Sequence, residues 1–349
     1  MRWLYPIHLI SIQAFVQAIM RFLNLRFVGS LLGLGCLGIL LIAYVGCSRG
    51  KKEPLRPTIV LFTDFSTHDA ALAQIKGAIK TIHPQADIID ISRDVFRADA
   101  LANAYLLDQT ARYFPAGAVF VVALSDPVST KARPIALMTQ AGKIYVGPDS
   151  GVFGRVIQRE GLQDARVIEN QELFFKPSQD MSSTASGIEY YAPIGGYLSK
   201  DYPLSAVGPS LLSPGRDIFG PVAAHLADGL RFKHIGPRAA NLQPRMLPPN
   251  PTVLNKQITG QIIYIDPRGD VITNILSEHL TDFDREQLIR VSYMGHNFAL
   301  PFVEHPDRAP EGRLFCYLND NNELQISLPN GSAAALMNAR MGQMIIIRY

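Results

Sequence analysis

Residues 57–64 read PTIVLFTD, a run of apolar residues that closes on an aspartate, and the pattern that follows this run decides the fold. Residues 69–82 place apolar side chains at every third or fourth position, which predicts a helix. A second apolar run at 86–92, a helix over 98–113 and a third run at 118–124 repeat this order. Strands that alternate with helices form right-handed βαβ units, so the sequence predicts an α/β domain with a mainly parallel sheet and flanking helices.

Aspartates stand where three of the predicted strands end. Asp64 closes the first run, Asp126 follows the third, and Asp149 follows a further apolar run that begins at Lys143. Ligands of parallel sheets bind beyond the carboxyl ends of the strands. A single aspartate at such a place is explained by its preference for caps and turns. Three of them along one edge favour a shared ligand site.

A different pattern begins after residues 237–251, PRAANLQPRMLPPNP, whose proline content is typical of a linker. Beyond this segment, short apolar runs alternate with turn residues, at 261–266, 271–275, 288–293, 314–318, 323–328 and 344–349. Such runs, with a period of two, predict a small antiparallel β-barrel. The sequence therefore predicts two domains, an α/β domain over 57–240 and a C-terminal barrel over 252–349.

The end of the predicted α/β domain contains an internal duplication, over residues 188–237. Residues 188–209 align with residues 216–237 at an offset of 28, and both copies end in Gly-Pro. Each copy is predicted to form an aromatic-containing turn, a helix and a Gly-Pro stop. Two copies are too few for a solenoid, so we assign the duplication to a single domain.

The N-terminal part of the chain, residues 1–47, has the features of a membrane leader. Residues 27–46, FVGSLLGLGCLGILLIAYVG, carry no charge and are long enough to span a bilayer. They follow two arginines and precede Cys47, a basic, apolar and small-residue order that defines a secretory signal. A cysteine at this place resembles the bacterial lipoprotein signal, in which the cysteine is lipidated and becomes the new N-terminus.

Other interpretations of the leader stay open. It could remain as an uncleaved anchor, or contain two spanning segments if residues 3–20 belong to the protein. A start at Met20 would give a leader of conventional length. Each interpretation predicts an exported protein anchored to a membrane. Residues 48–56 are polar and contain proline, which is typical of a tether.

Composition excludes several classes of protein. The chain has 349 residues, with 33 Lys+Arg against 30 Asp+Glu, and Arg2, Arg21 and Arg26 account for the whole positive excess. The neutral body lacks the basic patch expected of a nucleic-acid-binding protein. An apolar content of 48% excludes a disordered chain. Three cysteines cannot build a disulfide framework, and the absence of CxxC and of His-rich clusters in the sequence gives no sign of a structural metal.

Eight short motifs follow one another in a recognisable order. They are Thr63-Asp-Phe-Ser with Lys76-Gly77, Asp90-Ile-Ser, Phe114-Pro-Ala-Gly, Asp126-Pro127, Gly147-Pro-Asp-Ser-Gly151, Gly215-Arg-Asp-Ile-Phe-Gly-Pro221, Ile265-Asp266 with Gly269, and Gly331-Ser-Ala-Ala. Together, over residues 57–349, they resemble the adenosine-forming S-adenosylmethionine (SAM) hydrolase family and its relatives, the SAM-dependent fluorinases and chlorinases.

The resemblance implies a fold, an assembly and a reaction. The family has an N-terminal α/β domain and a C-terminal β-barrel, and it forms homotrimers that bind SAM between neighbouring subunits. Water, hydroxide or halide displaces methionine from the C5′ carbon of SAM. SAM is then a substrate, and no cofactor is implied.

The resemblance also implies roles for individual residues in ligand binding. Asp64 matches the carboxylate that binds the ribose diol, and Asp266 matches the one that binds the methionine ammonium. Asp149 lies in a further shared motif. The adenine is met by the barrel segment that holds Asn330, Ser332 and Ala333. Asp270 stands where the family has an adenine-contacting asparagine, and an ionised carboxylate lacks the donor of that amide.

In the family hydrolases, an Asp, an Arg and a His prepare the attacking water. Asp126 matches the Asp. The first family Arg falls on Ala132, so Arg133 and Lys131 are the candidates to replace it. The family His falls on Pro214 in the second repeat copy and on Ser186 in the first.

The choice between the two repeat copies is left open by spacing along the chain. Spacing from Pro148 favours Ser186, and spacing to Asp266 favours Pro214. The related halogenases have a serine at this position. His68, in the loop after Asp64, is a further candidate base.

Three functions are consistent with the sequence. The first is a SAM-cleaving enzyme, a hydrolase that forms adenosine and is weakened by its altered site. The second is a non-catalytic exported lipoprotein that binds a nucleoside or another small molecule. The third is a structural envelope lipoprotein that keeps only the fold. The altered Arg and His positions and the predicted export favour the last two, whereas the retained aspartates favour the first two.

Overall fold

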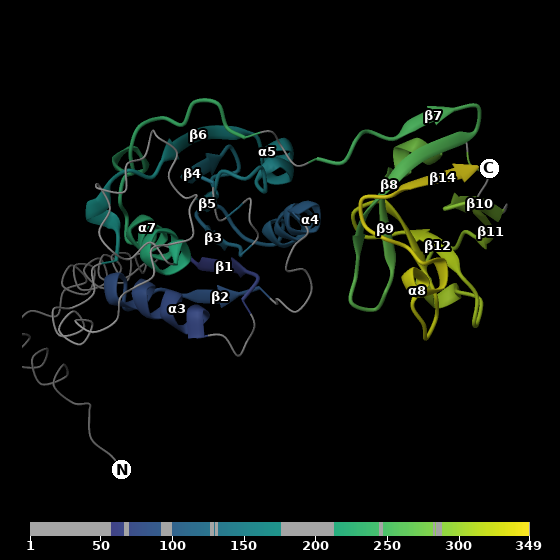
Figure 1. The fold of residues 1–349 in the computed structure, drawn as a ribbon, viewed down its shortest axis with the longest axis horizontal. Coiled ribbons are helices and arrows are strands. Elements are labelled where there is room, and N and C mark those ends of the chain that lie inside the picture. The colour runs from purple at the N-terminus through teal and green to yellow at the C-terminus, as the bar shows by residue number, and fades with distance from the viewer. Residues whose placement is uncertain are drawn as a thin grey trace, which may run out of the picture. The chain divides into compact units, whose positions relative to one another are not determined.

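The computed structural model describes most of the chain after the predicted tether (Figure 1). The described residues are 57–65, 70–91, 100–125, 129, 132–175, 213–243, 247–281, 283 and 288–348. The predicted leader, with Cys47, and the first repeat copy lie outside these ranges. Within them, no helix has the length and hydropathy needed to cross a membrane.

The first fold is built on a six-stranded sheet, in the order β2-β1-β3-β5-β4-β6. Its strands are β1 (Ile59–Thr63), β2 (Ile88–Asp90), β3 (Val119–Ala123), β4 (Pro134–Thr139), β5 (Ile144–Pro148) and β6 (Leu162–Val167). The strands β2, β1, β3 and β5 are parallel to one another. The mainly parallel sheet is therefore confirmed. The strands β4 and β6, which sequence reasoning did not find, add an antiparallel edge.

Helices cover both faces of this sheet, and β1 and β3 are therefore buried along their whole length. On one face, α3 (Ala70–Ile82) and α7 (Gly220–Ala227) pack against Ile59 and Leu61. On the other face, α4 (Ala100–Ala111) and α5 (Gly154–Glu160) pack against Val60 and Phe62. Alternate residues of β1 thus pack into the two hydrophobic cores on opposite faces of the sheet, between the sheet and its helices (Figure 1).

Short helical turns complete the first fold. A π-helical turn, η4 (Gly215–Phe219), leads into α7. The 3₁₀ turns η2 (Gln171–Leu173) and η5 (Phe232–His234) lie on either side of this unit in the sequence. The second repeat copy contains the predicted helix, but this helix ends at Ala227, and η5 lies between it and Gly236-Pro237.

The second fold is an antiparallel sheet that nearly closes into a barrel. Its strands are β7 (Thr252–Leu254), β8 (Gln257–Ile265), β9 (Val271–Leu276), β10 (Leu288–Tyr293), β11 (His296–Pro301), β12 (Phe315–Leu318), β13 (Glu323–Ser327) and β14 (Met344–Arg348). The order is β11-β10-β14-β8-β9-β13-β12, with β7 paired to β8. A bridge between Phe302 and Cys316 brings the two ends of this order together. The predicted C-terminal barrel is confirmed, and β7 and β11 are additions to it.

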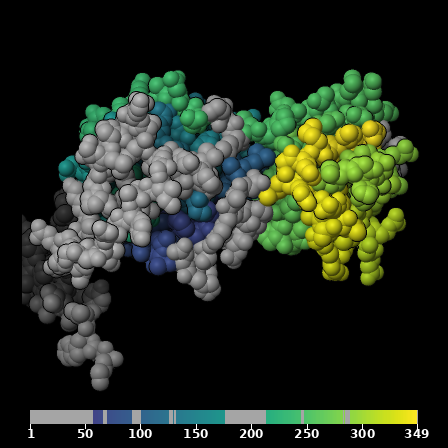
Figure 2. Space-filling model, viewed as in Figure 1, coloured from purple at the N-terminus to yellow at the C-terminus, as the bar shows by residue number. Residues whose placement is uncertain are grey.

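The core of the barrel comes from alternate residues of its strands, such as Ile289 and Val291 of β10 and Ile345 and Ile347 of β14. The turns η6 (Ser277–Leu280) and η7 (Pro306–Arg308) and the helix α8 (Ala333–Met337) connect the strands. The last part of the chain, drawn in yellow, forms much of the near face of this fold in the space-filling view (Figure 2).

Candidate functional site

The carboxyl ends of β1 and β3 bring two polar residues into contact. Asp64 follows β1 and is only 6% exposed. The backbone N–H of Ser125, after β3, lies 3.0 Å from Oδ1 and 2.9 Å from Oδ2 of Asp64, and the Ser125 hydroxyl donates to Oδ2 at 2.6 Å. An ionised carboxylate can accept about four hydrogen bonds. Asp64 is thus held in one orientation and keeps capacity for a ligand hydroxyl.

Sequence reasoning missed Ser125. Its signal was available, because it is the polar residue between the third apolar run and Asp126. Asp126 itself lies outside the described residues, as do Ser186, Lys131 and His68, so their predicted roles stay predictions. Asp126 nonetheless follows directly in the chain after the residue that orients Asp64.

The second repeat copy reaches the same edge of the sheet. A Cβ atom on Gly215 would lie 2.9 Å from Cβ of Ala123, the last residue of β3, and equally close to the Ile75 side chain. Only glycine fits there without a shift of its neighbours. Pro214, one residue earlier, is the N-terminal cap residue of η4. The position that the resemblance assigns to the family His in this copy therefore lies near the carboxyl end of β3.

Arg133 and Asp149, predicted respectively as a catalytic and a ligand-binding residue, contact each other. Arg133 Nε donates to Asp149 Oδ2 at 2.8 Å, and Nη2 donates to the carbonyls of Ala240 and Asn241 at 2.7 and 2.8 Å. The backbone N–H of Gln243 donates to the other oxygen of Asp149 at 3.0 Å. The pair therefore fixes the segment 240–243 against the sheet. The Arg133 guanidinium, predicted as a catalytic group, is therefore engaged with Asp149 and with this segment.

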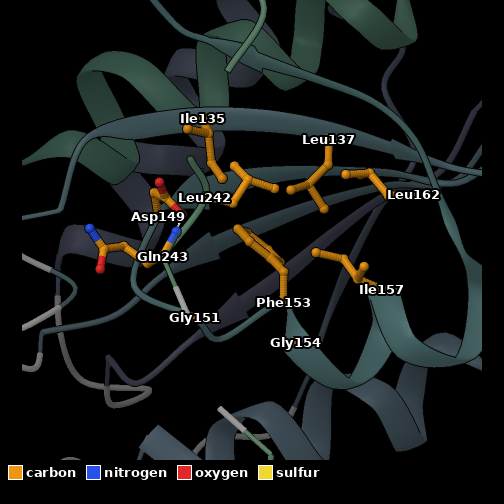
Figure 3. Close-up of a pocket in the computed structure, with 10 residues that line it drawn as sticks. All are labelled: Ile135, Leu137, Asp149, Gly151, Phe153, Gly154, Ile157, Leu162, Leu242 and Gln243. Atoms are coloured by element: carbon orange, nitrogen blue, oxygen red, sulfur yellow. Dashed lines mark hydrogen bonds between the residues drawn. The ribbon is translucent and has the colours of Figure 1, made fainter. Parts of the chain in front are cut away.

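A cavity of about 270 Å³ lies beside Asp149 (Figure 3). It is lined mainly by apolar side chains, those of Ile135, Leu137, Phe153, Ile157, Leu162 and Leu242. Asp149 and Gln243 lie together at one end of it, as Figure 3 shows. Because the rest of the lining is apolar, this cavity offers few groups that could orient a polar nucleoside.

In the barrel, the turn between β8 and β9 brings predicted ligand-binding residues together. Asp266 Oδ1 accepts from the backbone N–H groups of Arg268 and Asp270, at 3.0 and 2.8 Å. Gly269 has a φ of 86°, and a Cβ there would lie 1.9 Å from Oγ of Ser332. Glycine is therefore required both by the backbone conformation and by the close approach of Ser332.

The facing segment is fixed by the start of α8. Ser332 caps this helix by accepting from the N–H of Ala335 at 3.0 Å, and Ala333 is fully buried. The N–H of Ala334 donates to the carbonyl of Gly269 at 2.8 Å. The turn and the start of α8 are thus joined in one wall.

A cavity of about 640 Å³ opens at this wall. Its polar lining includes Arg268, Asp270, Ser327 and Asn330. Phe315 and Tyr317 also line it, with stacked rings whose centroids are 5.7 Å apart. Flat aromatic walls next to a few converging polar groups suit a planar heterocycle with hydrogen-bonding edges. Sequence reasoning did not assign Tyr317 or Ser327, whose only signal was their place in predicted strands.

Electrostatics at this cavity centre on Asp270, which is 6% exposed. Burial raises the pKa of its carboxyl, and the neighbouring charge of Asp266 raises it further, while hydrogen bonds from Ser327 and Gln325 and the charge of Arg268 oppose the shift. The Asp270 carboxylate raises the pKa of Arg268 in turn. A protonated Asp270 would regain the donor that the family amide supplies.

The described residues offer no cluster of three or more His, Cys, Asp or Glu side chains that could hold a metal ion. Cys316 is a free thiol inside the barrel, and burial raises its pKa.

Comparison with known proteins gives consistent matches. Residues 59–208 match the family described as SAM hydroxide adenosyltransferase N-terminal domain, and residues 260–346 match the corresponding C-terminal domain. The chain is 32% identical over 300 residues to (R)-S-adenosyl-L-methionine hydrolase of Methanocaldococcus jannaschii, covering 82% of this chain and 94% of that protein. It is 25% identical to a fluorinase of an Actinoplanes species, covering 83% of this chain and 97% of that protein.

A solved structure supports the same conclusion for the fold. The crystal structure of an uncharacterized conserved protein from Thermotoga maritima superimposes with a TM-score of 0.70 at 27% sequence identity, covering 84% of this chain and all of that one. This chain therefore shares its overall fold with that protein.

Proposed function

This chain belongs to the SAM hydroxide adenosyltransferase family, and from that premise we propose that it cleaves SAM, with water or hydroxide displacing methionine from C5′ to give adenosine. The observation that carries the proposal is the Asp64–Ser125 contact at the carboxyl edge of the sheet, immediately before Asp126. The altered Arg and His positions and the predicted export are the arguments for the alternative, a binding protein without turnover, and neither the described structure nor the comparisons add to them.

Displacement of methionine from SAM requires few catalytic groups of the protein. SAM is a sulfonium whose methionine is a good leaving group, so the enzyme must mainly hold the nucleophile, C5′ and sulfur in line. Asp64, fixed by Ser125, accepts the ribose hydroxyls in the proposed complex. The Asp266 carboxylate binds the methionine ammonium, and the barrel cavity receives the base. Charge-assisted hydrogen bonds of this kind are among the stronger ones.

Asp126 orients the attacking water in this proposal. The water oxygen attacks C5′ as the C5′–S bond breaks, and the electron pair of the C5′–S bond leaves with methionine. The proton of the attacking water passes to solvent or to Asp126. SAM is itself the reactant, and we propose that the reaction needs no cofactor.

The purified chain, in detergent, is expected to convert SAM to adenosine and methionine, detected by liquid chromatography. Asp64→Ala should bind adenosine at least tenfold more weakly, about 1.4 kcal/mol, because the ribose loses its fixed acceptor. Glu169→Ala, on the loop after β6, serves as a control and should leave binding unchanged. Parent-like adenosine binding by Asp64→Ala would show that the ribose assignment is wrong, and a parent that neither binds nor converts SAM would refute the proposed function.

We also propose an exported, membrane-anchored homotrimer. The leader sequence supports the anchor, and the family resemblance supports the trimer, in which the sheet edge of one subunit and the barrel of its neighbour would share a ligand. An exported site requires that SAM be present on the outer side of the membrane that holds the anchor.

Cleavage of the leader is expected before Cys47, with a lipid attached to that cysteine. A basic region, an apolar region and a small residue before cysteine meet the requirements of such a signal. Mass spectrometry of the membrane fraction should find a lipidated N-terminal Cys47. An unmodified peptide that runs from Val45 through Arg49 as the main species would instead establish an uncleaved anchor.

A further inference from the structure

We propose that Arg268 sets ligand specificity at the barrel cavity by occupying, in the ligand-free protein, the place of the ligand's own cationic and amino groups. This inference rests on the proposed function, because it assumes that a SAM-like ligand enters this cavity.

The geometry of the turn supports the proposal. Arg268 Nε lies 3.3 Å from Asp266 Oδ2, and Arg268 Nη2 donates to Asp270 Oδ2 at 2.9 Å. One guanidinium therefore spans both carboxylates. The side chain of Arg268 is 76% exposed, whereas those of Asp266 and Asp270 are 18% and 9% exposed. An exposed cation thus lies over two largely buried acceptors, of which Asp270 lines the cavity and Asp266 lies beside it in the same turn.

The charges of this cluster explain why a cation is needed there. Burial raises the pKa of the Asp270 carboxyl, and the nearby charge of Asp266 raises it further, because two negative charges at this distance disfavour each other. The other side chains that hydrogen-bond to Asp270, those of Gln325 and Ser327, are neutral. Among the described residues, Arg268 is the cation paired with these two carboxylates. A ligand that brings its own ammonium group can take over this role.

Displacement of Arg268 is physically accessible. Exposed ion pairs contribute little net stabilisation, because water screens them and the long side chain loses rotamer freedom when it is held. A site that is open only part of the time binds its ligand with an affinity reduced by that fraction. Arg268 should therefore weaken binding without preventing it.

The proposal distinguishes between ligands. A molecule with both an ammonium group and an amino-substituted base replaces Arg268 at both carboxylates. Adenosine, which has no ammonium group, replaces it at Asp270 only. Loss of Arg268 should therefore strengthen binding of the first kind of ligand more than binding of adenosine.

The test is calorimetric titration of the full chain, in detergent, with S-adenosylhomocysteine and with adenosine. S-adenosylhomocysteine carries the ammonium and the base but has no sulfonium, so it is not expected to be cleaved during the titration. Arg268→Ala should bind S-adenosylhomocysteine about three- to tenfold more tightly than the parent, with a smaller gain for adenosine. The control is Arg238→Ala. Arg238 is an exposed arginine that does not line the cavity, and its Nε lies 3.9 Å from Oδ1 of Asp164. This variant should bind as the parent does.

The outcomes separate this inference from the proposed function. Unchanged or weaker binding of S-adenosylhomocysteine by Arg268→Ala, with a binding-competent parent, would overturn the inference and leave the proposed function standing. Binding by the variant alone would support the masking by Arg268 and would show that its effect exceeds the expected three- to tenfold. If parent and variant both fail to bind either ligand, the proposed function and this inference fall together. A thermal melt of each variant confirms that it is folded.

Discussion

The double variant Ala132→Arg/Pro214→His is expected to hydrolyse SAM about 10²-fold or more faster than the unmodified chain, which should itself be slow. Positioned acid–base groups contribute ~10²–10⁴-fold to enzymatic rates. Two of the three positions that prepare the water in the family are altered here. The unmodified chain keeps Asp126, which can orient a water, but it lacks the cationic and imidazole partners that the resemblance implies.

The structure indicates which substitutions should restore these partners. Arg133 is held by Asp149 and two carbonyls, so a new arginine at 132 leaves that arrangement intact. Pro214 precedes Gly215, which touches the end of β3. The backbone at Pro214 has φ −54° and ψ −32°, an ordinary helical conformation that histidine adopts without strain.

Steady-state kinetics of four proteins check this prediction: the parent, Pro214→His, the double variant, and Ser186→His with Ala132→Arg. A gain only in the Ser186 variant would identify the first repeat copy as the equivalent of the family loop. The gain should vanish when Asp126→Asn is added. A parent that already hydrolyses SAM as fast as typical family hydrolases would contradict the prediction of a weakened site, and His68 or Arg133 would then be the next residue to replace.

Replacement of Glu160 by alanine is expected to lower the free energy of unfolding by about 3–5 kcal/mol, the usual cost of leaving one buried charge without its partner. Lys143 Nζ donates to Glu160 Oε1 at 2.9 Å, and their side chains are 7% and 2% exposed. Thr139 Oγ1 and the Tyr145 hydroxyl donate to the other carboxylate oxygen at 2.8 and 3.1 Å. Without Glu160, the Lys143 ammonium would keep the carbonyl of Ala111 as its acceptor.

Urea denaturation of three proteins measures this effect. Glu160→Ala should shift the midpoint strongly, whereas Lys143→Met/Glu160→Leu should lose much less, because apolar groups of similar size can replace a buried pair at little cost. A loss below about 1 kcal/mol for Glu160→Ala would mean that the pair behaves as a solvated one. Because Glu160 lies at the end of α5, on the face of the sheet covered by α4 and α5, adenosine binding at Asp64 should be retained where the variant remains folded.

Much of the fold could be predicted from local patterns. Buried strands such as β1 and β3 are continuous apolar runs, and the barrel strands alternate, because each strand must bury one or both faces. The strands β4 and β6 were missed. Their sequences, PIALMT and LQDARV, carry no strong strand signal, and it is their pairing with β5 and with each other that defines them.

Some features of the candidate site likewise follow from the sequence, and others only from the tertiary structure. The sequence by itself determined that Asp64 ends a buried strand and that Asp266 and Asp270 flank a glycine turn, since strand ends and turns follow from spacing and residue type. Only the tertiary structure decided which of these side chains contact one another. It paired Arg133 with Asp149, set Ser125 against Asp64 across two strands, and placed Arg268 over both turn carboxylates. Period and propensity act within a few residues, whereas these contacts depend on strand order and register, which are fixed by packing of the whole chain.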